Sequence, residues 1–496
     1  MKKRSRFFAG LCSAALAASI IPVSAEGSKT TFCEAVPENV RILGRTVYND
    51  DSLWLANSVS GVEFTVTGSQ VTFNLNVSGD PTRIGVYLNG ELYQRGLIGK
   101  QSKKGSVTVP LSSGDNTVKL IKLSESMQSE LGIDSIEIDA DAAIEPTSAK
   151  ERKLEFIGDS ITCGYGIDLP LKDPETNKAN SFSTASEDAS KTYAYQIAEM
   201  FDSDANFFSM SGCGVWCNYG GNRDHTMEKY YTKSSLNTWN SISSSGYVLI
   251  QNFDWDFSQY RPDCIVINLG TNDWSYFGSH IDEKDKYKES YIDLLKMVRE
   301  NNPDAKIVCT LGMMGAELFS DMDDAVKDYT SETGDKEVYT LELGAIDQKN
   351  EGYGVDYHPQ PATNTRVAND ELGPLIADVM GWELGEMPDD GTLTHTPDDL
   401  IVGEYHKQQE NDESSSVSES ESSSKAESIS SSESKAGSVS SSSASAGSSS
   451  KTDTSSAGSK AASNPNSSQN PTTGMAGGMA MIAIMGGAVI ASKRKK

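Results

Sequence analysis

The chain has 496 residues, and its 70 Asp and Glu against 43 Lys and Arg give a formal net charge of −27. So strong a negative charge argues against nucleic acid as a partner, because nucleic acid phosphates attract basic surfaces. Once a leader, a spacer and a tail are set aside, about 385 residues remain, which is enough for two domains of ordinary size.

Residues 1–25 have the pattern of a secretory signal peptide. A basic cluster at 2–6 precedes an apolar run at 7–21, and small residues follow. We therefore expect export of a mature chain that begins at Glu26.

Six cysteines remain in this mature chain. Cys213 and Cys217 are close enough in sequence to pair, whereas Cys163, Cys264 and Cys309 lie in apolar stretches typical of a core. The spacing matches no zinc-binding pattern. We expect mostly reduced, buried thiols, with one disulfide as an open alternative.

Residues 26–148 carry the signals of strands and turns. Polar and apolar residues alternate at 62–66 and 71–77, and Asn89-Gly90 is a strong hairpin signal. Short strands at regular spacing predict an all-β sandwich of the jelly-roll type. Such a domain either binds sugar or serves only as a packing and spacer domain, and the fold alone does not decide between them.

The pattern changes to alternating strands and helices over residues 149–385. Continuous apolar strands bounded by helices favour a three-layer α/β domain with a central parallel sheet. The predicted strands are 154–157, 207–211, 263–269, 306–311 and 338–343, and the predicted helices are 193–201, 285–299 and 363–377.

Four loops of this domain carry the groups needed for acyl transfer. Ser160 follows the first strand, glycines 212 and 214 follow the second, Asn272 follows the third, and His358 lies in a later loop. A serine nucleophile needs a base such as histidine, and its tetrahedral intermediate needs hydrogen-bond donors. The backbone N–H of Ser160, that of a loop glycine and the Asn272 amide are candidates for the oxyanion hole. This chemistry requires no metal and no cofactor.

The four loops resemble the motif blocks of the SGNH (GDSL-type) hydrolases. The jelly-roll domain in front, together with Gly212-Cys-Gly-Val215 and Asp356-Tyr-His-Pro359, most resembles carbohydrate esterase family 2. The resemblance implies an enzyme that removes O-acetyl groups from plant polysaccharides. It also implies Ser160 as nucleophile, His358 as base, and Asn272 with Gly214, in preference to Gly212, as oxyanion donors.

The group that orients His358 departs from the superfamily pattern. Most members place an acid three residues before the histidine, where this chain has Val355, and Asp356 is only two residues before it. Family 2 members work with a Ser–His dyad in which a backbone carbonyl orients the ring. The resemblance therefore implies a dyad, with Asp356 as the alternative orienting acid.

Three aromatic residues adjoin the motif loops. Trp216, Trp274 and Tyr357 are candidates for stacking on sugar rings, and each has a core position as its alternative. Two acidic residues beside the motifs have structural expectations: Asp159 caps the turn before the serine, and Asp273 holds its own loop.

The C-terminal part contains an extension at 386–409, a serine-rich linker at 410–469 that is expected to be disordered, and a tail at 470–496. The tail resembles a Gram-positive sortase signal, with Asn470 in place of the usual leucine. The resemblance implies attachment of Thr473 to peptidoglycan. The alternative is a membrane tail anchor, and either form leaves the protein on the cell surface of a Gram-positive bacterium.

Taken together, these features predict a secreted, surface-anchored carbohydrate esterase. Its expected substrates are acetylated hemicelluloses such as xylan or mannan. Two alternatives are an esterase for another acylated substrate, either peptidoglycan or lipid, and a glucan-binding surface protein whose esterase activity is secondary.

Overall fold

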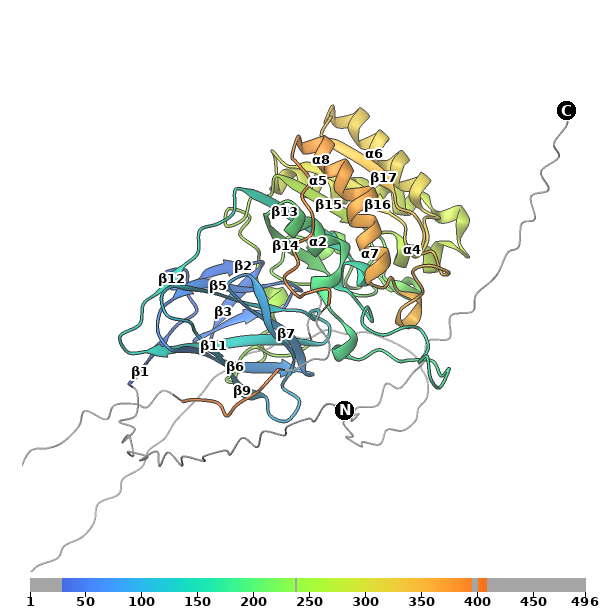
Figure 1. Ribbon diagram of the computed structural model, residues 1–496. Helices are drawn as coiled ribbons and strands as arrows, with labels where there is room; N and C mark the ends of the chain where they lie inside the picture. Colours follow the sequence, from blue (N-terminus) through green and yellow to red (C-terminus); the bar gives the residue numbers. More distant parts are fainter. Residues whose placement is uncertain (1–28, 237–238, 395–399, 408–496) are drawn as a thin grey trace, which may run out of the picture. The chain divides into compact units, whose positions relative to one another are not determined.

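The computed structural model describes residues 29–236, 239–394 and 400–407, all within one compact unit that ends at Gln408 (Figure 1). The signal peptide, the serine-rich linker and the sorting signal lie outside the described residues. Within the described ranges, every helix is too short or too polar to cross a membrane.

The N-terminal part forms two antiparallel six-stranded sheets that enclose an aliphatic and aromatic core (Figure 1). The all-β sandwich predicted from the strand pattern is thus confirmed. One sheet has the order β3 (Thr46–Asn49), β4 (Ser52–Leu55), β11 (Ser129–Asp139), β6 (Gln70–Gly79) and β9 (Lys104–Pro110), and β1 (Thr30–Cys33) also pairs with β11. The other has the order β12 (Ile144–Pro146), β5 (Gly61–Val66), β10 (Asn116–Lys122), β7 (Thr82–Leu88) and β8 (Glu91–Ile98), and β2 (Arg41–Leu43) pairs with β5.

The predicted hairpin turn joins β7 to β8. Asn89 and Gly90 both have positive φ, at 55° and 89°. A two-residue turn with both φ positive matches the right-handed twist of the flanking strands, and Asn-Gly adopts it with little strain.

The second part contains a five-stranded sheet whose strands are all parallel. Ile265 and Ile267 pack in the same core cluster as α5 (Asp285–Asn301) and α6 (Phe319–Thr333). Val266 packs in the cluster that contains α2 (Tyr193–Met200) and α8 (Gly373–Met380), so both faces of the sheet are buried. The spatial order is β14 (Ser203–Ser209), β13 (Arg152–Gly158), β15 (Cys264–Asn268), β16 (Lys306–Leu311) and β17 (Val338–Glu342).

The helices differ from the sequence-based expectation in two ways. The segments α3 (Met227–Tyr230), α4 (Thr271–Phe277) and α6 (Phe319–Thr333) were not predicted, and the single helix expected at 363–377 is divided by a π-helical segment, η7 (Val367–Leu372). The α-helices are α1 (Ser160–Cys163), α2 (Tyr193–Met200), α3 (Met227–Tyr230), α4 (Thr271–Phe277), α5 (Asp285–Asn301), α6 (Phe319–Thr333), α7 (Pro361–Arg366) and α8 (Gly373–Met380).

Buried ion pairs join the two parts. The Arg45 guanidinium, from the sandwich, lies 2.9 Å from the Glu155 carboxylate in β13, and Arg95 lies 2.9 Å from Asp188. All four side chains are almost completely buried. Loss of one partner in such a pair leaves an uncompensated buried charge, so these contacts fix how the domains dock.

The C-terminal extension returns to the sandwich. We call its described residues, 386–394 and 400–407, the C-terminal strap. The Leu92 N–H donates to Asp390 O at 2.8 Å, and Gly403 forms an antiparallel bridge with Ser106 of β9. The strap is therefore part of the folded unit, and it pairs with the sandwich through backbone hydrogen bonds to β8 and β9.

Candidate active site

Ser160 lies just beyond the carboxyl end of strand β13 of the parallel sheet. β13 ends at Gly158, and α1 begins at Ser160. Asp159 Oδ1 accepts a hydrogen bond from the Ile161 N–H at 3.0 Å and caps this short helix, as expected. A side chain at Gly158 would overlap Thr162, so the tight strand-to-helix turn requires glycine here.

His358 reaches Ser160 from the loop after β17. The short 3-10 segment η6 (Val355–Tyr357) contains Asp356 and Tyr357 with φ of 50° and 66°. This left-handed turn places His358 Nε2 2.8 Å from Ser160 Oγ, and the imidazole is 9% exposed. The structure therefore brings the predicted nucleophile and base into direct contact.

The environment of His358 favours its basic form. Burial lowers the pKa of the imidazole to about 4, while the Val355 carbonyl and the Asp356 charge act to raise it. The ring is therefore neutral near pH 7. Nδ1 lies 3.1 Å from Val355 O, which can only accept, so we assign the proton to Nδ1 and leave Nε2 free to accept from Ser160.

Asp356 faces a different partner. Its carboxylate accepts a hydrogen bond from Tyr165 Oη–H at 3.0 Å, and the side chain is exposed. The Tyr165 ring lies 4.5 Å from the His358 ring, at an interplanar angle of 36°. The partner of His358 Nδ1 is thus the backbone oxygen that a dyad requires. The Asp356 carboxylate bonds Tyr165, whose ring lies between it and the imidazole in the chain of contacts.

Asn272, at the start of α4, sits where three loops meet. Its Nδ2 donates to Asp159 Oδ2 at 3.0 Å and to Cys213 O at 2.9 Å. Both amide hydrogens therefore have protein partners in this state. The Asn272 side chain must exchange one of them in order to donate to an oxyanion.

The two loop glycines have different surroundings, and these reverse the preference drawn from the sequence. The Gly214 N–H donates to Asn218 Oδ1 at 3.1 Å, and a side chain at Gly214 would overlap Cys217 O and Asp273. Gly212 has φ of 75°, and a methyl group there would meet only Tyr219 Cβ, at 3.8 Å. Throughout the described ranges, no acceptor is found for the N–H of Gly212 or of Ser160. The glycine with a free donor is therefore Gly212.

Asp273 braces a neighbouring loop, and the expectation that it holds its own loop is wrong. Its carboxylate accepts the backbone N–H groups of Val215, Trp216 and Cys217 at 2.8–2.9 Å. Burial raises the pKa of Asp273 to about 6, while these three donors act to lower it. The loop that carries Gly214 is thus fixed by a carboxylate on α4.

The aromatic candidates divide between surface and core. Tyr357 is 44% exposed beside His358, and Trp274 is half-buried under the Lys284 ammonium, which lies 5.4 Å from its ring centroid. Trp216 is buried against Tyr276 and Phe277, which is the core alternative.

A pair of aromatic rings was missed in the sequence. Tyr165 and Phe182 stack with centroids 4.0 Å apart, next to His358. Tyr165 stands five residues after the nucleophile, which is the one signal that links it to the site.

The six cysteines that the structure describes are all free thiols. Cys213 and Cys217 are both buried, and burial raises the pKa of each above its usual range. The expectation of reduced thiols is confirmed for these residues, without the alternative disulfide.

These features define a serine esterase. A serine hydroxyl contacts a neutral imidazole at the end of a parallel sheet, and free backbone donors lie on the adjoining loops. Residues 156–366 match the GDSL-like Lipase/Acylhydrolase family, and residues 42–147 match the Carbohydrate esterase 2 N-terminal family. The second part of the chain is thus similar to GDSL-like acylhydrolases, and the part before it is similar to the N-terminal domain of carbohydrate esterase 2 proteins.

Curated relatives agree with this assignment. The chain is 34% identical over 278 residues to the Cellulase/esterase CelE of Acetivibrio thermocellus, covering 55% of this chain and 31% of that protein. It is also 24% identical over 358 residues to an Acetylxylan esterase / glucomannan deacetylase of Cellvibrio japonicus, covering 72% and 93% of the two chains.

Solved structures show the same two-domain fold. An acetyl xylan esterase from Butyrivibrio proteoclasticus aligns with a TM-score of 0.63 at 24% identity, covering 71% of this chain and 99% of that one. A family two carbohydrate esterase from Clostridium thermocellum in complex with cellohexaose aligns with a TM-score of 0.60 at 28% identity, covering 69% and 100%.

Proposed function

We propose that this protein removes O-acetyl groups from polysaccharides, with hemicelluloses such as xylan or mannan as substrates. The observation that carries the proposal is the 2.8 Å contact between Ser160 Oγ and His358 Nε2. It occurs in a chain whose relatives include an acetylxylan esterase / glucomannan deacetylase.

The first half of the reaction forms an acetyl-enzyme. Ser160 Oγ attacks the acetyl carbonyl carbon while His358 Nε2 takes the hydroxyl proton. Val355 O stabilises the resulting imidazolium through Nδ1–H. The tetrahedral intermediate then breaks its bond to the sugar oxygen, which leaves with the proton from Nε2, and the acetyl group remains on Ser160.

The oxyanion of that intermediate is held by donors on the same edge of the sheet. The free N–H groups of Ser160 and Gly212 supply two hydrogen bonds. The Asn272 amide supplies a third after it releases Asp159 or Cys213.

The second half of the reaction hydrolyses the acetyl-enzyme and regenerates free Ser160. Water loses a proton to His358 Nε2 and attacks the acetyl-Ser160 carbonyl, the same donors hold the new oxyanion, and acetate leaves as Ser160 regains its proton. Exposed Tyr357 and half-buried Trp274 offer flat surfaces beside the site for sugar rings.

The test is acetate release by the full chain from acetylated xylan, acetylated mannan and O-acetylated peptidoglycan, each supplied separately. We expect release from the hemicelluloses and its loss in Ser160→Ala. Release from peptidoglycan alone would instead support the alternative substrate, and a lipid ester serves as a further arm.

A second candidate function is glucan binding, because a similar solved structure is a complex with cellohexaose. Isothermal titration of the Ser160→Ala chain with cellohexaose measures it without turnover. Binding together with weak acetate release by the wild type would make the esterase activity secondary.

We further propose that the protein is exported through residues 1–25 and attached to peptidoglycan at Thr473. The proposal rests on the basic–apolar leader and on the Asn470-Pro-Thr-Thr-Gly474 motif. Fractionation of the producing cells tests it. Detergent-resistant retention in the wall that is lost in Thr473→Ala supports the sortase reading, and detergent extraction supports a tail anchor.

A further inference from the structure

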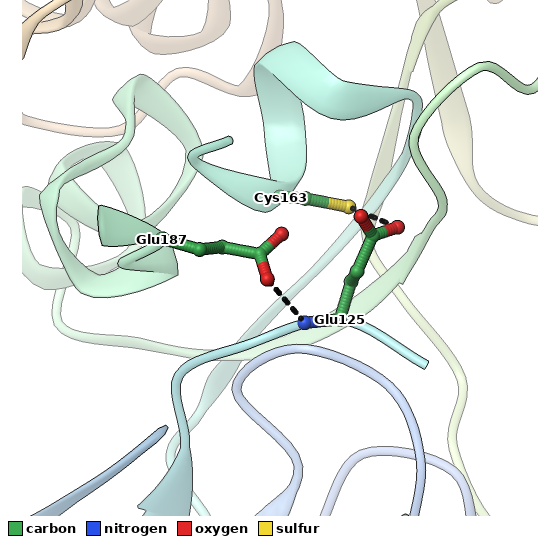
Figure 2. Close-up of side chains that lie close together, drawn as sticks. All are labelled: Glu125, Cys163 and Glu187. Carbon is green, nitrogen blue, oxygen red and sulfur yellow. Dashed lines mark hydrogen bonds between the residues drawn. The ribbon is translucent and has the colours of Figure 1, made fainter. Parts of the chain in front are cut away.

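Glu125 comes from the sandwich but contacts two segments of the active site. Figure 2 shows its side chain beside those of Cys163 and Glu187. Glu125 stands three residues after β10. Its Oε2 accepts the Ser211 N–H at 2.6 Å, next to Gly212, and faces Cys163 Sγ at 3.7 Å. Cys163 is the last residue of α1, which begins at Ser160. One carboxylate therefore contacts both the nucleophile helix and the oxyanion loop.

The backbone around Glu125 is itself fixed. Glu187 Oε2 accepts the Glu125 N–H at 3.2 Å, and Lys122 Nζ donates to Ser124 O and Glu125 O at 2.6 and 2.8 Å. Glu125, Glu187 and Lys122 are completely buried. The backbone that presents the carboxylate is thus buried and held by hydrogen bonds on both its N–H and its carbonyl oxygen.

The cluster packs two buried carboxyl groups beside one ammonium group. Burial raises the pKa of Glu125, and it raises that of Glu187 well above its usual range, with the Glu125 charge adding to the effect at Glu187. The Ser211 N–H acts to lower the pKa of Glu125, and the Lys122 ammonium acts to lower the pKa of both carboxyl groups. Each carboxyl group has an oxygen, Oε1, without a partner in the described part of the chain, and Figure 2 shows the two groups facing one another.

We propose that Glu125 is a positioning residue for the reaction: its carboxylate sets the place of the Gly212 N–H relative to Ser160. The inference rests on the proposed esterase function. It makes the sandwich domain a working part of the active site, because the group that aligns the two loops comes from the segment that follows its strand β10. Small displacements of an oxyanion donor are costly to the rate, so such a brace affects turnover more than ground-state binding.

The same side chains admit a metal-binding reading, since ligand atoms of Glu125, Cys163 and Glu187 lie within 4.8 Å of one another. Two observations oppose it. The Lys122 ammonium already faces the cluster, and burial raises the pKa of the Cys163 thiol, whose Sγ also lies 3.2 Å from Ser209 Oγ. Metal ligation needs a thiolate.

The experiment compares Glu125→Gln with Glu155→Gln in the full chain. Glu155 is a matched control: it is also a buried glutamate that receives donors from both domains, but its partners are Arg45, Asn206 and Tyr231. We expect Glu125→Gln to lower kcat for an aryl acetate by about 10- to 100-fold with KM changed by less than about threefold. Glu155→Gln should lower the melting temperature comparably and leave kcat within about twofold. Equal loss of kcat in both variants, or none in Glu125→Gln, overturns the inference.

A second comparison uses Cys163. Cys163→Ser keeps a donor toward Glu125 and should retain more turnover than Cys163→Ala. Stoichiometric metal in the purified wild-type chain, lost in Cys163→Ala, would overturn the inference in favour of the metal site.

The inference and the proposed function fail separately. If the wild type releases no acetate from any polysaccharide, labelling of Ser160 by a fluorophosphonate still reports alignment of the site. Slower labelling in Glu125→Gln than in Glu155→Gln then supports the inference alone, and equal rates reject it.

Discussion

His358 Nε2 lies 2.8 Å from Ser160 Oγ although 198 positions separate the two residues in the chain. Their meeting depends on the turn at Val355–Tyr357, which also turns Val355 O toward the other imidazole nitrogen. One short segment therefore provides both the base and the group that orients it.

This arrangement predicts unequal effects for two neighbouring substitutions. His358→Ala removes the base and should lower kcat/KM for an aryl acetate by about 10²–10⁴-fold. Asp356→Asn should change it by less than about threefold, because Asp356 bonds Tyr165 rather than the imidazole. If Asp356→Asn approached the loss seen in His358→Ala, the dyad would be rejected.

The buried imidazole predicts a low acid limit for activity. Its pKa is lowered to about 4 from an ordinary value of 6.5, so His358 remains a neutral base well below pH 6. We expect kcat/KM to fall as pH drops through the folded value, near 4. A midpoint near 6.5 would show that the imidazole is not desolvated as described.

The same shift affects stability. Between the folded and unfolded pKa values the unfolded chain binds the extra proton, so the His358 contribution is complete above about pH 6.5 and is lost as pH falls toward 4. Urea unfolding across this range measures it. His358→Gln should show a smaller pH dependence than the wild type.

The two loop glycines should fail in different ways. Gly214→Ala should destabilise the fold strongly, because a methyl group overlaps Cys217 O and Asp273. Gly212→Ala has space and should cost only about 1–2 kcal/mol of backbone strain, while lowering kcat by moving an oxyanion donor. Thermal unfolding and kcat are measured together. A fully active, stable Gly214→Ala would contradict this assignment.

Tyr357 should affect only large substrates. Tyr357→Ala removes an exposed ring beside His358 and should raise KM for acetylated xylan by about three- to tenfold, with little change for an aryl acetate. Tyr247→Ala is the control, because Tyr247 is another exposed aromatic and its hydroxyl donates to Trp239 O, outside the motif loops. If Tyr357→Ala changed the kinetics for both substrates equally, Tyr357 would instead be needed for the folding or the alignment of the site.

The sequence was sufficient to place Ser160 and His358 together, because motif loops after parallel strands share one sheet edge. It favoured Gly214 over Gly212 because it could not show that the Gly214 N–H is occupied, which depends on the hydrogen bond that this N–H donates to the Asn218 side chain, four residues later. Glu125 carried no sequence signal at all: a glutamate after a sandwich strand does not reveal that its carboxylate lies under another domain's loops.

The C-terminal strap has a mechanical consequence. Any tension applied to the chain beyond residue 407 first meets the pairing of Gly403 with Ser106 and the bond from the His406 N–H to Asn74. These contacts anchor the load in the sandwich sheet before it can reach α8. If the protein is tethered at its C-terminal end, a force that pulls on this tether is transmitted to the sandwich and not to the catalytic loops.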